Sequence, residues 1–209
     1  MRLLEGCSIV FQPIFQLSQQ RIIGYEALLR GPKKPEWIIE QAVQHDLILQ
    51  LDQAIHKMAI QKMEKQDQLL FLNCHPRTLS SLNFDLYKNI SQKIVFEITE
   101  NEYIAPAVLS TFLMEAKKRG FHVALDDFGA GYHCLSMLTY CDFDFIKLDK
   151  RLIQNLSNGF IHKLVHLLVN SEAVIIGEGI ESPEDLEQCL KLNVPYGQGF
   201  YLSEPIPFI

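Results

Sequence analysis

Oxygen-bearing and ionisable side chains stand at or near the end of almost every short apolar run in this 209-residue sequence. They are Glu26, Asn73, Glu97, Asp126 with Asp127, Lys147 with Asp149, Glu178 and Gln198. Carboxylate and amide oxygens are the ligands that Mg²⁺, Mn²⁺ and Ca²⁺ prefer, whereas zinc favours thiolate and imidazole. If the fold brings these side chains together, they predict a site for hard divalent cations.

Electrostatics favours the same interpretation. Carboxylates held close together without a cation raise one another's pKa, and each pKa unit costs about 1.4 kcal/mol. A divalent ion removes that cost, and the adjacent Asp126 and Asp127 could bridge a pair of ions. Lys147, the one cation of the set, could act as a base, as a phosphate anchor or only as an ion-pair partner.

Each of these acids taken singly has an ordinary interpretation. An acid that follows a strand is more often a solvated loop residue or a helix cap than a ligand. The prediction therefore depends on the whole set, because the same kind of residue recurs at the end of nearly every run.

The elements that would position these residues alternate along the chain. Eight β-branched, apolar or aromatic runs predict strands: Ser8–Phe15, Arg21–Leu29, Leu69–Asn73, Ile94–Glu97, His122–Asp127, Phe143–Leu148, Ala173–Glu178 and Tyr196–Tyr201. Helical periodicity fills Glu36–Lys65, which has room for two helices, and also Ala105–Lys118, Lys150–Val169 and Pro183–Leu192. The last opens with Ser182 as a cap and Pro183 in the first turn.

Strands that alternate with helices indicate a mostly parallel α/β sheet, and eight of them favour a closed (β/α)₈ TIM-like barrel. The carboxyl ends of barrel strands meet at one mouth, where the polar residues would converge. Only about five residues, Gln16–Gln20, join the first two strands. Because a parallel crossover needs more, we expect an irregular barrel with one antiparallel strand at its start.

The composition of the chain excludes some classes of function and indicates its domain organisation. Nineteen basic against 25 acidic residues give a formal charge of −6, which argues against binding to polymeric nucleic acid but not to a small nucleotide. With 48% hydrophobic residues and no linker or repeat, residues 1–209 are expected to form a single domain.

The sequence also carries signals about the compartment. No apolar run approaches the ~18–20 residues that span a bilayer, and Glu5 and Gly6 interrupt any signal-peptide core, so no membrane insertion is expected. The five cysteines are odd in number and form no CxxC pair, which is typical of a reducing, cytoplasmic setting.

Eight ordered blocks of this sequence resemble the EAL family of bacterial cyclic di-GMP phosphodiesterases. The blocks are Phe11–Ile14, Gly24–Arg30, Leu72–Asn73, Glu97–Glu100, Leu125–Tyr132, Ile146–Asp149, Gly177–Glu181 and Gln198–Phe200. The resemblance runs from about Ile9 to Pro207, and it implies a single EAL domain folded as the irregular barrel described above. It also implies hydrolysis of cyclic di-GMP to the linear dinucleotide pGpG by two divalent ions, Mg²⁺ or Mn²⁺, with Ca²⁺ as an inhibitor.

The resemblance further implies a role for each residue of the site. One metal would be held by Glu26, Asn73, Glu97 and Asp126, and the second by Asp126 and Asp127 with Glu178 close by. Lys147 would orient or deprotonate the attacking water, and Glu181 and Gln198 would complete the polar shell. Glu100 would brace the loop after Asp127. The expected substrate contacts are Gln12, Leu28, Arg30 and Gln198, with Arg30 bound to phosphate.

Some residues depart from the family's pattern. His133 and Cys134 replace two small hydroxyl residues in the loop after the fifth strand, which couples the family's dimer contact to its metal site. We expect a homodimer through this loop and the following helix, near Tyr132–Leu138. His75 follows Asn73 closely and is more readily interpreted as a cap of the next turn than as a substrate contact.

Three functions remain open on these grounds. The first is an active cyclic di-GMP phosphodiesterase, since every expected ligand is present. The second is a receptor that binds cyclic di-GMP without cutting it and acts through a protein partner. The third is another metal-dependent barrel enzyme, acting on a different phosphodiester or on a sugar.

Overall fold

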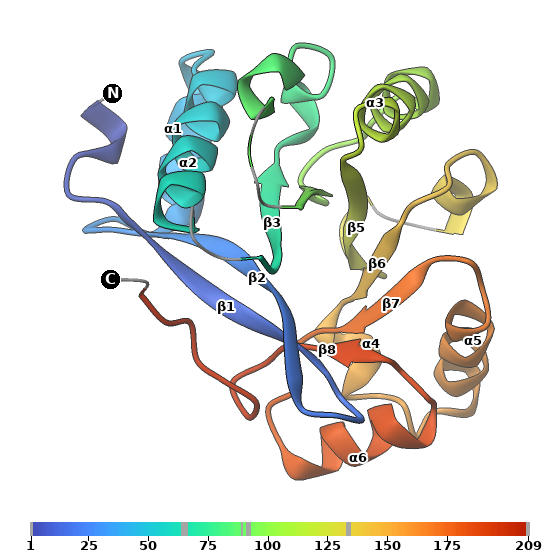
Figure 1. The fold of residues 1–209 in the computed structure, drawn as a ribbon. Helices are drawn as coiled ribbons and strands as arrows, with labels where there is room; N and C mark the ends of the chain where they lie inside the picture. The colour runs from blue at the N-terminus through green and yellow to red at the C-terminus, as the bar shows by residue number, and fades with distance from the viewer. Residues whose placement is uncertain (1, 64–66, 89, 91–92, 133–134, 208–209) are drawn as a thin grey trace.

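The eight strands close into a barrel in sequence order, β1 to β8 (Figure 1). The computed structural model describes residues 2–63, 67–88, 90, 93–132 and 135–207. The first strand runs antiparallel to both of its neighbours, β2 and β8, and the other adjacent pairs are parallel. The expected irregular barrel with one antiparallel strand is therefore confirmed.

The strands start close to where the sequence predicts. They are β1 (Ser8–Gln16), β2 (Arg21–Arg30), β3 (Leu69–Cys74), β4 (Ile94–Ile98), β5 (His122–Phe128), β6 (Phe145–Leu148), β7 (Val174–Gly177) and β8 (Tyr196–Gly197). The last strand is much shorter than predicted. The chain turns after Gly197, and the N–H of Tyr201 bonds to the carbonyl of Ile180 instead of extending a ladder.

Helices surround the barrel (Figure 1). They are α1 (Pro35–Gln44), α2 (Ile48–Met63), α3 (Pro106–Lys118), α4 (Lys150–Ile153), α5 (Gly159–Val169) and α6 (Pro183–Lys191). Short 3₁₀ turns complete the connections: η1 (Arg2–Leu4), η2 (Pro76–Thr78), η3 (Phe84–Tyr87) and η4 (Leu135–Thr139). The predicted cap Ser182 is present at the start of the last helix, and it forms a capping box in which Ser182 and Asp185 bond to each other's backbone.

The helical segment predicted over Lys150–Val169 consists of two helices, α4 and α5. The side chain of Asn158 accepts hydrogen bonds from the backbone N–H groups of Phe160 and Ile161 and so starts a new helix. An asparagine that caps a helix satisfies backbone donors that a continuous helix would have used internally.

Period-two alternation explains how the barrel positions its polar residues. One layer of the interior is apolar and consists of Ile14, Phe71, Val95, Ala124, Phe145 and Ile176. Side chains two residues apart on a strand share a face. The next inward positions on the parallel strands β3 to β7 are therefore Asn73, Glu97, Asp126, Lys147 and Glu178. The strand ends thus place a polar layer directly above an apolar one.

β2 contributes to the same two layers through Gly24 and Glu26. A Cβ atom at Gly24 would lie 2.9 Å from Leu69 and 3.0 Å from the ring of Phe71, so the interior leaves no room there for a side chain. Glu26, two residues further on, then projects into the polar layer.

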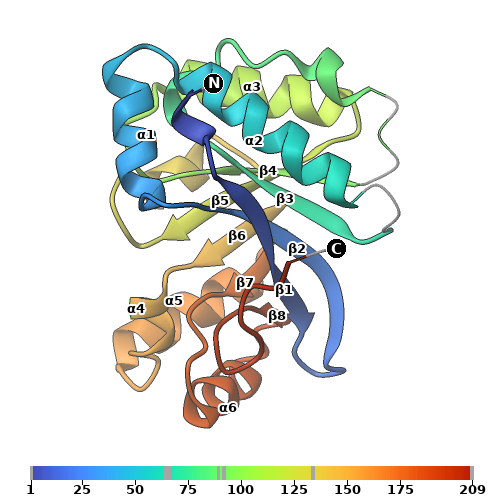
Figure 2. The ribbon, with the colours of Figure 1, turned by 90° about the vertical axis from the view of Figure 1, so that its left-hand side faces the viewer.

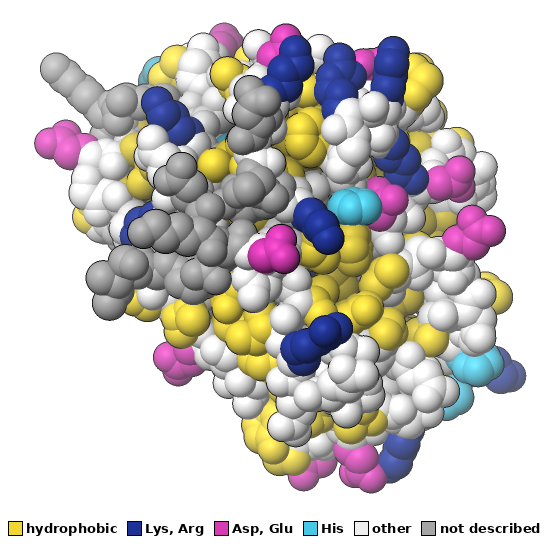
Figure 3. Space-filling view, viewed as in Figure 1, with side chains coloured by type: hydrophobic (Ala, Val, Ile, Leu, Met, Phe, Trp, Pro, Cys, Tyr) yellow, Lys and Arg dark blue, Asp and Glu magenta, His cyan; other side chains and the backbone are white. Residues whose placement is uncertain are grey.

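Figure 2 shows the carboxyl ends of β5 and β6 pointing to one side of the molecule. Figure 3 shows the opposite face, where apolar side chains gather in a hollow. A cavity of about 560 Å³ lies at this amino end of the strands, among His122, Phe145 and Val174. It contains none of the predicted site residues. Of the helices in the described part of the chain, none is long and apolar enough to cross a membrane.

Candidate active site

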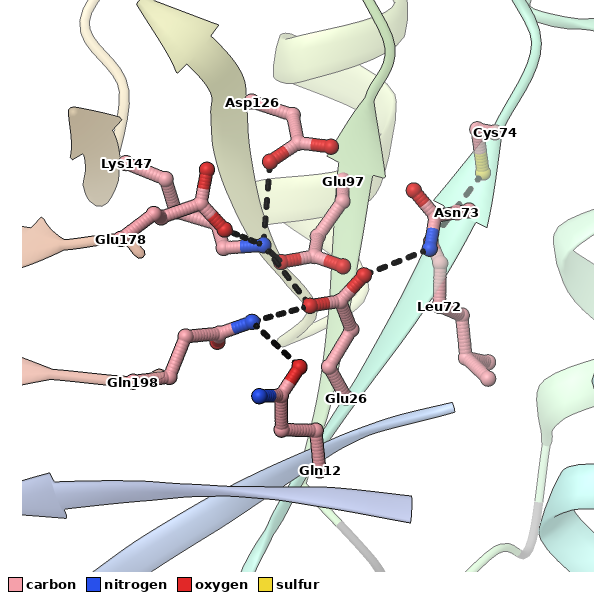
Figure 4. A network of polar contacts seen from close by, with 10 residues as sticks. All are labelled: Gln12, Glu26, Leu72, Asn73, Cys74, Glu97, Asp126, Lys147, Glu178 and Gln198. Atoms are coloured by element: carbon pink, nitrogen blue, oxygen red, sulfur yellow. Dashed lines mark hydrogen bonds and ion pairs between the residues drawn. The ribbon is translucent and has the colours of Figure 1, made fainter. Parts of the chain in front are cut away.

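Lys147 lies at the centre of the polar layer (Figure 4). Its side chain is only 1% exposed, and its ammonium group contacts four carboxylates. The distances from Nζ are 3.0 Å to Glu26, 2.8 Å to Glu97, 3.0 Å to Asp126 and 2.8 Å to Glu178. The cluster is built from β2, β4, β5 and β6 and from the residue directly after β7, so it exists only when the barrel is closed.

Glu26 connects the cluster, directly or through Gln198, to amide side chains on β3, on β1 and just after β8. Asn73 Nδ2 donates to its Oε1 at 3.1 Å, and Gln198 Nε2 donates to its Oε2 at 2.6 Å. Gln198 also lies 3.5 Å from Gln12 Oε1 (Figure 4). The structure therefore brings the predicted ligand Asn73 and the predicted substrate contact Gln198 against the same carboxylate, with Gln12 next to Gln198.

A local irregularity directs Asp127 toward the mouth. The pairing of β5 with β6 shifts register between Leu125 and Phe128, which is the signature of a β-bulge. Asp127 has a positive φ of 45°, an uncommon conformation for an aspartate. Carboxylate oxygens of Asp126, Asp127 and Glu100 lie within 4.8 Å of one another. Such a bulge lets two consecutive acids serve one site, although alternation would place them on opposite faces.

Burial and mutual repulsion shift the pKa values of the acids. Burial raises the pKa of Glu97, Asp126 and Glu178, and neighbouring carboxylates add to this effect against the opposing influence of Lys147. Burial together with Asp126 and Glu100 raises the pKa of Asp127 to about 7.

The pKa values of Glu26 and Lys147 shift in the directions that favour their charged forms. Burial raises the pKa of Glu26, but Lys147 and the amides of Gln198 and Asn73 outweigh it, and the pKa falls below its ordinary value. Burial would lower the pKa of Lys147, but the surrounding carboxylates raise it well above its ordinary value. One ammonium group cannot neutralise four carboxyl groups, and the pKa values of Glu97, Asp126 and Glu178 therefore stay raised.

The donor set fits hard divalent cations. Every side chain predicted as a ligand offers oxygen, the atom that Mg²⁺ and Mn²⁺ prefer. Glu97 Oε2 and Gln198 Oε1 are buried, and neither accepts a hydrogen bond from the residues that the structure describes. A buried carboxylate oxygen without a partner is costly, and a cation would supply one.

The mouth of the barrel contains two adjoining cavities that share Glu26, Leu28 and Asp126. The first, of about 410 Å³, is also lined by Gln12, Asp127, Glu178, Glu181 and Gln198. The second, of about 300 Å³, is also lined by Arg30, Asn73 and Glu100. All the predicted site residues except the fully buried Glu97 and Lys147 therefore line the mouth, and these two lie in the cluster below it.

Three predicted residues have contacts outside the cluster. Glu181 is half exposed and pairs with Lys150 at 3.8 Å. Arg30 donates to the carbonyl of Leu29, at the exposed end of β2. The carbonyl of Glu100 accepts the N–H of Tyr132 at 3.3 Å, so Glu100 touches the loop that follows Asp127.

Sequence reasoning missed part of the second cavity. Asp52, Thr99 and Asn101 line it, and none of them belongs to the predicted strand-end set. The available signal was a polar residue, Asp52, within the buried stripe of α2. His75 also lines this cavity, and its ring accepts the N–H of Arg77 as the cap of η2, which confirms the predicted capping role.

The raised pKa of Asp52 predicts that the free energy of unfolding depends on pH. Burial raises its pKa from 3.8 to about 7, against hydrogen bonds from His75 and Thr78 that lower it. Between these pH values the folded chain holds a proton that the unfolded chain has released. The contribution of Asp52 to the free energy of unfolding is therefore most favourable at pH 4 and below. It falls as the pH rises toward 7, by about 1.4 kcal/mol per unit of difference between the folded and unfolded pKa.

Asp52→Asn should flatten this part of the stability curve. Urea unfolding of the metal-free chain from pH 4 to 8 measures it, and the difference between variant and wild type isolates Asp52 from the other buried acids. Asp85→Asn is the matched control, because Asp85 is exposed and pairs only with Lys88 among the described charges. Parallel curves for wild type and Asp52→Asn would contradict the prediction.

Comparison with known proteins places this geometry in a family. The sequence profile described as "EAL domain" matches residues 4–205. PdeB of Escherichia coli, a probable cyclic di-GMP phosphodiesterase, is 27% identical over 94% of this chain and 42% of its own length. RocR of Pseudomonas aeruginosa, a cyclic di-GMP phosphodiesterase, is 30% identical over 94% of this chain and 57% of its own length. The chain thus spans about half the length of these relatives.

Solved structures agree with the fold. The EAL enzyme Bd1971, bound to cAMP and cyclic di-GMP, superposes with a TM-score of 0.86 at 22% identity, over 98% of this chain and 63% of that one. BlrP1 of Klebsiella pneumoniae, with manganese and cyclic di-GMP, gives 0.85 at 24% identity, over 96% and 56%. The family profile covers almost the whole chain, and the barrel agrees with it. This chain belongs to the EAL domain family.

Proposed function

We propose that this chain hydrolyses one phosphodiester bond of cyclic di-GMP to give linear pGpG, with two divalent metal ions. The observation that carries the proposal is the buried cluster in which Glu26, Glu97, Asp126 and Glu178 converge around Lys147. Membership of the EAL family supports this choice of substrate, since relatives that match most of this chain are named as cyclic di-GMP phosphodiesterases.

The proposed ligand sets are those that the resemblance to the EAL family implies. Glu26, Asn73, Glu97 and Asp126 would hold one ion, and Asp126, Asp127 and Glu178 the other. Bound ions of this kind polarise a phosphate and lower the pKa of a water molecule. Mg²⁺ and Mn²⁺ are the proposed ions, and Ca²⁺ the proposed inhibitor.

The chain's own side chains would then position the reactants. Lys147 would orient the attacking water from the centre of the cluster, because its raised pKa keeps it an ammonium group that cannot accept the proton. Gln12 and Leu28 line the first cavity and would contact the substrate, while Arg30, at the edge of the second, would bind a phosphate through a charge-assisted bond. Gln198 holds Glu26 at 2.6 Å, and Glu181 would complete the polar shell of the first cavity.

Removing the metal should abolish turnover. The chain is incubated with cyclic di-GMP and Mn²⁺ or Mg²⁺, and pGpG is quantified by chromatography and mass spectrometry. Excess chelator should stop pGpG formation completely, and renewed addition of Mn²⁺ should restore it, because the chain itself offers no other cation than Lys147 in the described cluster.

Two outcomes would reject the proposal. Turnover that persists in excess chelator would exclude the metal-dependent reaction. Micromolar binding of cyclic di-GMP with no pGpG after long incubation with metal would instead identify a receptor that acts through a protein partner.

We also propose a homodimer through the segment that follows β5. Tyr132 and Leu135 support it, because both are more than half exposed and large apolar side chains at a surface favour association. His133 and Cys134, the unusual residues of this segment, lie outside the described residues. A cytoplasmic location, like the homodimer, stays a prediction.

A further inference from the structure

Two buried polar side chains on α2 have no role in the proposed reaction. Asp52 is 7% exposed and His56 is 1% exposed, and both lie in the buried stripe of this helix. They are four residues apart, so they project from the same face. Both contact the chain at the end of β3: His56 bonds to the backbone of the candidate metal ligand Asn73, and Asp52 bonds to the backbone of His75, two residues later.

His56 contacts the backbone of Asn73 directly. Its Nε2 lies 2.8 Å from the carbonyl oxygen of Asn73, and its Nδ1 lies 2.6 Å from the hydroxyl of Tyr87. A carbonyl oxygen can only accept, so Nε2 must carry the hydrogen. In the neutral ring Nδ1 then accepts the Tyr87 hydroxyl, and this bond selects the tautomer that can donate to Asn73.

Strand pairing explains why the Asn73 carbonyl needs this donor. β3 pairs with β4 as far as Cys74, but it pairs with β2 only as far as Phe71. Successive carbonyls of a strand point to opposite sides, and that of Cys74 accepts the N–H of Thr99 on the β4 side. The Asn73 carbonyl therefore faces the side where β2 no longer pairs. The ring N–H of His56 supplies the hydrogen bond that a paired strand would otherwise donate to this carbonyl.

Asp52 holds the same segment one step further along. Its Oδ2 accepts the backbone N–H of His75 at 3.0 Å and the hydroxyl of Thr78 at 2.9 Å. The two α2 side chains thus fix the backbone on both sides of Cys74. The side chain of Asn73 points inward, where its Nδ2 donates to Glu26 and leaves its oxygen to face a cation.

We propose that His56 and Asp52 are positioning residues that hold the end of β3 so that the amide oxygen of Asn73 is set for metal binding. The inference rests on the proposed function in its assignment of Asn73 as a ligand. It makes α2, outside the barrel, part of the support of the metal site. Residues that orient a ligand in this way typically change metal affinity by about 10–100-fold when they are replaced.

The matched test replaces His56 by two similar amides of different reach. The amide nitrogen of His56→Gln lies at the depth of Nε2 and can donate to the Asn73 carbonyl, whereas that of His56→Asn is too short. Mn²⁺ affinity is measured without substrate from the electron paramagnetic resonance signal of free Mn²⁺. We expect His56→Asn to lose at least about tenfold in affinity and His56→Gln to stay near wild type.

A stability control separates positioning from general damage. Leu109→Ala removes a fully buried side chain on α3. It should lower the thermal midpoint of unfolding at least as much as His56→Asn does, without changing Mn²⁺ affinity. Thr78→Val is a milder variant for the case in which His56→Asn does not fold. It removes the hydroxyl that bonds to Asp52 and to the carbonyl of His75, and we expect Mn²⁺ affinity to fall by about two- to fivefold.

Unchanged Mn²⁺ affinity in His56→Asn, or in Thr78→Val if the former does not fold, would overturn the inference. An equal loss of affinity in Leu109→Ala would also overturn it. Failure of the proposed function has a different signature. If the wild-type chain does not cut cyclic di-GMP but binds Mn²⁺ in a His56-dependent way, the proposed reaction fails and the positioning role stands.

Discussion

Replacing Lys147 by methionine is expected to lower kcat by about 10²–10⁴-fold, the range typical of a group that moves or orients a proton. Methionine keeps most of the side-chain length but removes the ammonium group. KM for cyclic di-GMP should change less than kcat, because Lys147 lies beneath the mouth and is fully buried. Metal affinity should not fall, since the oxygen ligands stay in place.

The same substitution should also destabilise the metal-free chain. Removing one partner of a buried ion pair costs about 3–5 kcal/mol, and here four carboxylates lose their shared cation. Urea unfolding with chelator and with Mn²⁺ measures this loss, and Mn²⁺ should recover much of it. Lys191→Met is the matched control, because Lys191 is exposed and pairs only with Glu187 among the described charges. An unchanged kcat in Lys147→Met would remove the proposed role.

Replacing Glu26 by glutamine is expected to reduce turnover by at least about 100-fold and to weaken metal binding. Glu26 accepts hydrogen bonds from Asn73, Gln198 and Lys147. Glutamine has a single acceptor oxygen, so its amide group would point a donor at another donor. Changes outside the ligand shell already cost about 10–100-fold, and Glu26 is a candidate ligand itself.

Turnover and Mn²⁺ affinity are measured together for this variant. Glu187→Gln on α6 makes the same chemical change on the surface, where the side chain is 65% exposed, and should leave both values unaltered. A Glu26→Gln chain that binds Mn²⁺ and turns over like wild type would show that the cluster around Lys147 is not the reaction centre.

Local patterns were sufficient to predict most of the fold. Runs of apolar, β-branched and aromatic residues located the strands, and the short Gln16–Gln20 connection required an antiparallel start. The polar end of each strand followed from the same periodicity, since Asn73 is two residues beyond Phe71 and therefore shares its inward face. These features depend on near neighbours in the chain, so they can be read without the tertiary structure.

Other features depended on contacts between distant residues. Glu26 and Lys147 meet across 121 positions of sequence, and Gln12 and Gln198 across 186. No local pattern indicates that Lys147 shares its ammonium group among four carboxylates. The split between α4 and α5 also escaped prediction, because hydrophobic periodicity continues across it while a single side chain, Asn158, starts the second helix.

The sequence by itself determined which ligand chemistry is available and in what order the strands present it, because residue type and period-two alternation are local properties. Only the tertiary structure decided which charges share one buried volume, and this shared burial shifts the pKa values of Glu26, Glu97, Asp126 and Glu178. It also decided that α2 reaches the end of β3. That contact exists because β2 stops pairing at Phe71 and leaves the carbonyl of Asn73 to the ring of His56.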